Sequence, residues 1–135
     1  MLRKVLRSKI HMARITQCDL HYVGSITIDA DLLAALDLRP NEAVWIYDIT
    51  NGSRFETYVI RGEPGSGIIG INGAAARLVD VGHEIIIANY AYLDATPDQL
   101  DNHIAKVIVC DENNRITETL HYDSVIHPSE SNITS

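Results

Sequence analysis

Short apolar and β-branched runs, separated by turn residues, recur along most of the chain. Near the N-terminus, apolar Ile10 and Met12 alternate with other residues, which is the period of a half-buried strand and not of an amphipathic helix. The pattern predicts strands over residues 2–17, 22–28, 43–49, 54–60, 67–72, 83–93 and 105–111. Many short strands with frequent turns favour a mainly β fold, closed or nearly closed into a barrel.

The clearest local signal is a hairpin. The runs AVWIYDI and RFETYVI, over residues 43–49 and 54–60, are joined through TNGS. The pair Asn51-Gly52 in this connection suits the positive φ angles of a tight turn. We therefore expect the two runs to pair as antiparallel strands.

Two short helices are expected between the strands. Asp29 can cap a helix over residues 30–38, which Pro40 would end. The leucines in this segment give it a buried stripe. Residues 73–79, GAAARLV, predict one or two further helical turns.

Length and composition favour one small domain without a membrane segment. The 135 residues fit one barrel domain over residues 1–123, followed by a polar, frayed tail over 124–135. The chain is 46% apolar. No segment approaches the unbroken apolar stretch of about 20 residues that a membrane helix needs. Cys18 and Cys110 lie far apart and no secretory signal precedes them, so we expect reduced thiols and a cytoplasmic protein.

The charge is unevenly distributed. The net charge is -7, yet the chain before Asp19 carries only basic charges. These are Arg3, Lys4, Arg7, Lys9 and Arg14. A basic arm for nucleic acid is one interpretation, but the alternation in this segment favours a strand with one polar face. The acidic remainder would weaken attraction to phosphates, so we expect no nucleic-acid partner.

Three common kinds of site are not favoured. GSGIIG, residues 65–70, has the spacing of a dinucleotide-binding loop, but it runs into a strand where that loop must open a helix. The histidines form no close pair on a helical face, and the cysteines have no CxxC spacing, so no metal site is expected. Ser25 lacks the surrounding glycines of a hydrolase nucleophile.

Gly24-Ser25, inside the run LHYVGSITID, is the unusual feature of the sequence. Glycine in a strand interior usually marks a bulge or a close backbone approach. A second interpretation is chemical: in a strained geometry, the Ser25 hydroxyl could attack the open Gly24 carbonyl and form an ester. Loss of the Ser25 α-proton would then expel the Gly24 carboxylate and leave dehydroalanine. Hydrolysis would convert dehydroalanine into a pyruvoyl group at a new N-terminus.

The wider sequence resembles the pyruvoyl-dependent aspartate decarboxylase family. The resemblance runs through KIHMARITQCDLHYVGSITID, ITNGSRFETYVI and INGAAARLVDVGHEIIIANY, and more loosely to VIVCDENNRI. It implies a double-psi β-barrel with short helices, a homotetramer, and sites between neighbouring subunits. It also implies autocatalytic cleavage into residues 1–24 and 25–135, and decarboxylation of L-aspartate to β-alanine for pantothenate biosynthesis. Whether a maturation factor assists cleavage is left open.

The resemblance also implies roles for individual residues. Ser25 becomes the pyruvoyl group, Gly24 ends the released chain, and Thr57 assists cleavage and contacts substrate. Tyr58 corresponds to the proton donor. The residues that would hold substrate carboxylates are Lys9 and Arg54. Those that would form the substrate-contacting turn or line the site are Asn72, Gly73, Ala74, Ala75, His11, Tyr22 and Tyr47. Tyr47 is a departure, because the family commonly has tryptophan there.

The implied chemistry agrees with the residue types. A pyruvoyl carbonyl forms a Schiff base with the amine of aspartate and accepts the electrons released with carbon dioxide, so neither pyridoxal phosphate nor a metal is expected. The planar fork of Arg54 suits a carboxylate, and Lys9 offers a point charge. Strand alternation places Arg54 and Tyr58 on one face and Thr57 on the other. The alternative function is an unprocessed barrel that binds a partner through the basic N-terminal strand.

Overall fold

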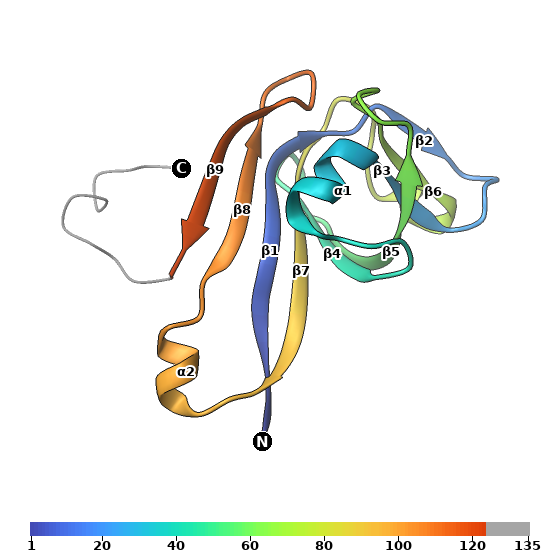
Figure 1. Cartoon of the computed structure of the whole chain (residues 1–135). Coiled ribbons are helices and arrows are strands. Elements are labelled where there is room, and N and C mark those ends of the chain that lie inside the picture. The colour runs from blue at the N-terminus through green and yellow to red at the C-terminus, as the bar shows by residue number, and fades with distance from the viewer. Residues whose placement is uncertain (124–135) are drawn as a thin grey trace.

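The computed structural model describes residues 1–123, so the tail predicted over 124–135 lies outside the described residues. The strands are β1 (Leu2–Arg14), β2 (Gln17–Asp19), β3 (Ser25–Asp29), β4 (Ala43–Asp48), β5 (Arg54–Gly62), β6 (Ile69–Asn72), β7 (Glu84–Asp94), β8 (Ala105–Cys110) and β9 (Ile116–Tyr122) (Figure 1). The helices are α1 (Ala30–Leu36), the 3-10 helix η1 (Gly73–Arg77) and α2 (Pro97–Asp101). The predicted mainly β class with short helices is confirmed.

The strands form one sheet in the order β2-β6-β3-β5-β4-β7-β1-β8-β9. Only Ile15 and Thr16 separate β1 from β2, so the chain passes directly from the β7 side of the sheet to the β6 side. The Ile15 amide donates to the carbonyl of His83 at 3.0 Å, and the Thr16 amide donates to the carbonyl of Ile69 at 2.8 Å. Strands β6 and β1 lie at opposite ends of the series β6-β3-β5-β4-β7-β1. The crossing segment connects these two strands, so the sheet closes into a barrel.

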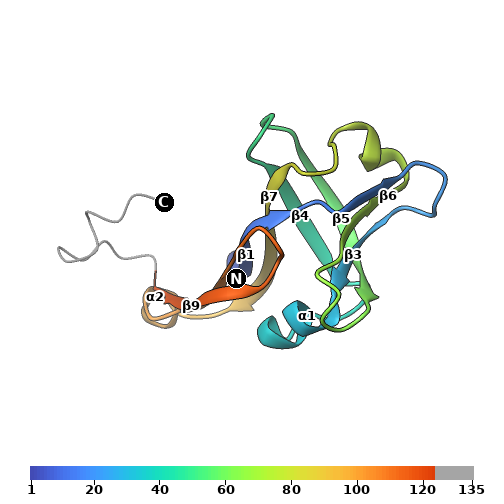
Figure 2. The ribbon, with the colours of Figure 1, turned by 90° about the horizontal axis from the view of Figure 1, so that it is seen from above.

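The strands β8 and β9 extend the sheet beyond the barrel. β8 pairs in parallel with β1, and β9 pairs antiparallel with β8. In the view from above, α2 and the end of β9 beside it lie on the opposite side of β1 from β3 (Figure 2). Every residue of β9 is exposed.

The barrel core is built from β-branched residues at alternate strand positions. Ile26 and Ile28 on β3 and Ile69 and Ile71 on β6 are each 0% exposed. The predicted leucine stripe of α1 is confirmed, because Leu32, Leu33 and Leu36 all belong to the core. Because the isoleucines of β3 point inward, Ser25 and Thr27 lie on its other face.

The hairpin predicted at Asn51-Gly52 is confirmed. β4 pairs antiparallel with β5 from Ala43–Tyr58 to Tyr47–Arg54. Gly52 adopts a φ of 80°. The carboxylate of Asp48 accepts hydrogen bonds from the amides of Thr50 at 2.8 Å and Asn51 at 3.1 Å, which fixes the turn.

Several predicted boundaries are wrong. The first strand stops at Arg14, where the chain begins its crossing to β6, and resumes as β2. Residues 22–24 are an exposed or half-buried loop and not the start of β3. The first helix ends at Leu36, because Asp37 adopts a left-handed conformation with a φ of 50° before Pro40 is reached.

Two elements were not predicted. α2 buries none of its residues, and Thr96 and Gln99 form a capping box at its start. β9 is the exposed edge strand. Both carry too little buried surface to leave a strong apolar pattern.

Candidate active site

Ser25 is the first residue of β3 and is buried, with 1% of its surface exposed. The antiparallel register with β6 sets Ser25 opposite Asn72, which is 3% exposed. The Asn72 side-chain amide donates to Ser25 Oγ at 3.0 Å and to Thr27 Oγ1 at 3.1 Å. Ser25 Oγ accepts this bond, so its own proton remains available for transfer. Asn72, which the resemblance places in the substrate-contacting turn, therefore contacts Ser25 directly.

Gly24 packs closely against Gly73, the residue after Asn72. A Cβ added to Gly73, whose φ is 75°, would lie 2.8 Å from Gly24 Cα and 3.1 Å from Gly24 N. A Cβ added to Gly24 would meet nothing within 4 Å. The close backbone approach expected at Gly24 is therefore present, and Gly73 is the residue that has no room for a side chain. The backbone at Ser25 is nearly fully extended, with a φ of 159°.

Tyr58 and Thr57 lie on β5, which runs parallel to β3. The register pairs Val59 with Ile26, the residues that follow Tyr58 and Ser25 respectively. Tyr58 therefore lies beside the start of β3. The predicted alternation is confirmed, because Arg54 and Tyr58 are exposed while Thr57 is half-buried on the other face.

Arg54 lies on the outer face of the barrel against Tyr47, its partner on β4. Its guanidinium carbon is 4.8 Å from the centre of the Tyr47 ring. A surface pocket of about 360 Å³ surrounds this contact and is lined by Lys4, Trp45, Tyr47, Arg54 and Tyr90. Lys4 and Tyr90 were not predicted at the site, because they come from strands distant along the chain.

Lys9 does not line the Arg54 pocket. Its ammonium group lies 6.0 Å from the centre of the Tyr122 ring on β9. Burial lowers the pKa of His11, and the positive charge of Lys9 lowers it to a smaller extent. The negative charge of Glu84 acts in the opposite direction. His11 Nδ1 is buried and has no hydrogen-bond partner among the described residues. The structure therefore places the two predicted carboxylate-binding cations of one chain in different surroundings.

The remaining predicted residues lie in the loop before Ser25 and in the turn after Asn72. Tyr22 lies in the loop before β3 and is 52% exposed, with its carbonyl oxygen near the Gly73 position. Ala74 is exposed and Ala75 half-buried, both in η1 directly after Asn72 and Gly73. Thr27 was missed, although its place two residues after Ser25 on the same strand face could have indicated it.

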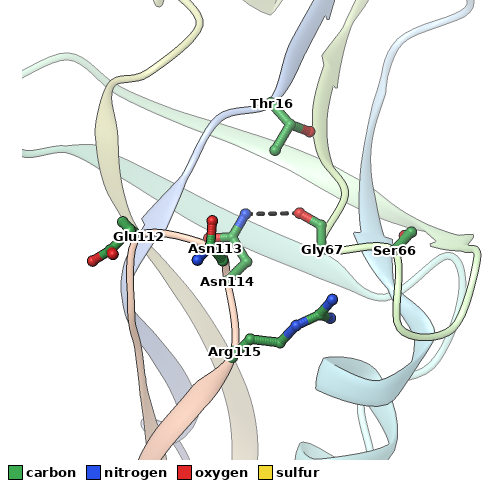
Figure 3. Close-up of a pocket in the computed structure, with 7 residues that line it drawn as sticks. All are labelled: Thr16, Ser66, Gly67, Glu112, Asn113, Asn114 and Arg115. Carbon is green, nitrogen blue, oxygen red and sulfur yellow. Dashed lines mark hydrogen bonds between the residues drawn. The ribbon is translucent and has the colours of Figure 1, made fainter.

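A second cavity contains none of the predicted site residues. It measures about 380 Å³ and is lined by Thr16, Ser66, Gly67, Glu112, Asn113, Asn114 and Arg115 (Figure 3). The buried Asn114 side chain donates to the carbonyl oxygens of Gly67 at 2.8 Å and Arg14 at 2.9 Å. As predicted, the glycine loop over residues 65–67 leads into a strand. Asn114 uses its amide to hold that loop, which is a structural role.

Within residues 1–123, no group of three or more His, Cys, Asp or Glu side chains could hold a metal ion. None of the helices in this part of the chain is long and apolar enough to cross a membrane.

The fold and the Ser25 cluster together define a small β-barrel protein in which a buried serine hydroxyl lies at the start of a strand, directly after a glycine with open space where a side chain would be. Residues 1–117 match the aspartate decarboxylase family, and the chain belongs to that family. The resemblance read from the sequence is thereby confirmed.

The relatives extend over most of the chain. Aspartate 1-decarboxylases from Staphylococcus aureus strains MSSA476, MW2 and JH9 are each 54% identical to it over 121 residues, which is 90% of this chain and 94% of the relative. Among solved structures, the computationally designed protein msDPBB_sym2 is 18% identical with a TM-score of 0.40, and the match covers 64% of this chain and 99% of that one.

Proposed function

We propose that this protein decarboxylates L-aspartate to β-alanine and carbon dioxide, after cleaving itself between Gly24 and Ser25. Membership of the aspartate decarboxylase family supports the reaction. The observation that carries the cleavage is the contact at Ser25: a buried hydroxyl, hydrogen-bonded to the Asn72 amide, next to a glycine with open space where a side chain would be.

The cleavage uses only the chain and water. Ser25 Oγ attacks the Gly24 carbonyl carbon, the bond from that carbon to the Ser25 nitrogen breaks, and an ester replaces the amide. Loss of the Ser25 α-proton expels the Gly24 carboxylate and leaves dehydroalanine. Its tautomer takes up water and releases ammonia, which leaves a pyruvoyl group on residue 25. The net change is a gain of one water and a loss of one ammonia.

The surroundings of Ser25 fit the product of this cleavage. Ser25 Oγ leaves as an oxygen of the Gly24 carboxylate, and the Asn72 amide that donates to Oγ can still donate to that carboxylate oxygen. The pyruvoyl group on residue 25 would supply a carbonyl that reacts with the substrate amine and withdraws electrons as carbon dioxide leaves. We assign to Tyr58 the delivery of a proton to the substrate carbon, because it lies on the strand beside Ser25 and carries a hydroxyl that can donate a proton.

The charged residues would bind the substrate carboxylates. Arg54 presents a bidentate fork on the barrel surface and Lys9 a point charge. We propose a homotetramer in which neighbouring chains complete each site, because one chain does not bring Lys9 to the Arg54 pocket. We also propose a place in pantothenate biosynthesis in the cytoplasm.

The alternative of a basic nucleic-acid-binding arm has no observation in its favour. β1, which carries the basic residues, pairs with β7 on one side and with β8 on the other. Its backbone is therefore part of the sheet and is not a free arm.

The direct test is turnover. Purified protein is incubated with L-aspartate, and β-alanine is measured by chromatography. We expect β-alanine from the wild type and none from Ser25→Ala. Equal production by both proteins would contradict the role of Ser25.

A further inference from the structure

The pocket around Arg54 is built on aromatic rings. Three of its five lining residues are Trp45, Tyr47 and Tyr90, and the other two are the cations Lys4 and Arg54. They come from β1, β4, β5 and β7, which are consecutive neighbours in the order β5-β4-β7-β1. The Lys4 ammonium lies 5.1 Å from the centre of the Tyr90 ring, as Arg54 lies over Tyr47.

Tyr47 and Tyr90 meet through their hydroxyl groups, which are 2.6 Å apart. The register sets Tyr47 opposite Ile86, so Tyr90 lies four residues further along β7. The two side chains must therefore extend toward one another along the sheet to make this contact. The Trp45 ring stacks beside Tyr47, with centroids 6.4 Å apart and an interplanar angle of 17°. The Tyr47 ring is thus fixed at its side and at its hydroxyl end.

Arg54 depends on that ring for its position. Among the described residues, no carboxylate forms an ion pair with Arg54 and no hydrogen bond holds its guanidinium. Its recorded partner is the face of Tyr47. Cation–π contacts of this kind are weak to moderate and depend on the ring staying under the cation. The guanidinium therefore keeps its donors free for a ligand while the ring sets its place.

Tyr47 stays neutral beneath the Arg54 cation. Burial and the hydrogen bond with Tyr90 raise the pKa of Tyr47 to about 12, and burial has the larger effect of the two. The Tyr47 hydroxyl is therefore protonated and does not neutralise the positive charge that Arg54 offers to a carboxylate.

We propose that Tyr90 is a positioning residue for substrate binding: through its hydroxyl contact with Tyr47, it holds the ring that places Arg54 for a substrate carboxylate. This inference rests on the proposed function, in which Arg54 binds a carboxylate of aspartate. Tyr90 acts through Tyr47 and does not itself touch the reacting atoms.

The test is Tyr90→Phe, which removes one hydroxyl and keeps the ring. Loss of one hydrogen bond that positions a binding group should raise KM for aspartate about 5-fold, and leave kcat and the extent of cleavage unchanged. Tyr47→Phe should raise KM similarly. The KM of the double variant should be no higher than that of either single variant, because both substitutions remove the same contact. Tyr92→Phe, at a 65% exposed position two residues along β7, is the matched control and should leave KM unchanged.

A second background separates positioning from general packing. Tyr47→Trp supplies a larger ring face for Arg54 and has no hydroxyl for Tyr90. In that background Tyr90→Phe should not change KM. An unchanged KM in the single Tyr90→Phe variant, or an equal rise in both backgrounds, would overturn the inference. Failure of the proposed function is distinguishable, because the wild type would then make no β-alanine.

Discussion

At the scale of single residues, the candidate site depends on two contacts between distant segments. Asn72 donates to Ser25 across the β3–β6 pair, and Gly73 leaves room for the backbone of Gly24. Each contact joins residues nearly fifty positions apart in sequence. Both lie at the peptide bond that we propose to be cleaved.

Gly73→Ala should block cleavage. The added Cβ would push on Gly24 and move the carbonyl that Ser25 attacks. Gly82→Ala is the matched control, because Gly82 also has positive φ, 90°, but open space around its α-carbon. Electrophoresis of the purified variants should show an uncleaved Gly73→Ala chain and a cleaved Gly82→Ala chain. Full cleavage of Gly73→Ala would contradict this role.

Tyr58→Phe should separate cleavage from turnover. Cleavage needs Ser25 and an activated Gly24 carbonyl, so the variant should still be processed. Its rate of decarboxylation should fall by a factor on the order of 10² to 10⁴, as is typical for loss of a general acid. Cleavage by mass and β-alanine release are measured in one preparation. A processed variant with full activity would mean that Tyr58 only packs in the barrel wall.

At the scale of elements, Asp29 connects three parts of the fold. Its carboxylate accepts hydrogen bonds from the amide of Asp31 at the start of α1, and from those of Gly65 and Gly67 before β6. Burial alone would raise the pKa of Asp29, but these backbone hydrogen bonds, with a smaller effect of Arg115, lower it below its usual value of 3.8. The ionised carboxylate is therefore the form that stabilises the fold.

The pKa of Asp29 is lower in the folded chain than in the unfolded chain. The stability that the ionised Asp29 carboxylate contributes is therefore complete above the unfolded pKa of 3.8 and is lost as the pH falls through the folded pKa. Asp29→Asn should lower the free energy of unfolding at pH 7 by about 1–3 kcal/mol. The free energy of unfolding of this variant should then fall less steeply than that of the wild type as the pH is lowered. Asp31→Asn, at an exposed neighbouring position, is the control. Chemical denaturation across pH 3–7 measures both. An acid decline as steep in Asp29→Asn as in the wild type would exclude this account.

The elements that the sequence predicts well are those with strong local signals. The Asn51-Gly52 turn and the leucines of α1 are readable within a few residues, and both are confirmed. β9 and α2 were missed because their side chains are exposed, and burial is the source of an apolar pattern. Asp37 ended α1 early through a left-handed conformation that the sequence alone does not specify.

At the scale of the whole molecule, the closed sheet brings distant residues together. The pairing of β3 with β5 and β6 gathers Ser25, Tyr58 and Asn72, and no local pattern predicts that pairing. Resemblance to a family identified these residues, whereas only the folded chain brings Lys4 and Tyr90 to the Arg54 pocket. The same topology leaves Lys9 beside Tyr122 and outside the Arg54 pocket, which is the basis for proposing that a second chain completes the site.

The central claim is that the chain cleaves itself at Gly24-Ser25, and the intact mass of the purified protein tests it most directly. We expect two species, residues 1–24 with a free carboxylate and residues 25–135 bearing a pyruvoyl group. Their summed mass should equal the uncleaved chain plus one water minus one ammonia. Ser25→Ala should show one uncleaved chain. An active preparation that contains only the full 135-residue mass would contradict the account.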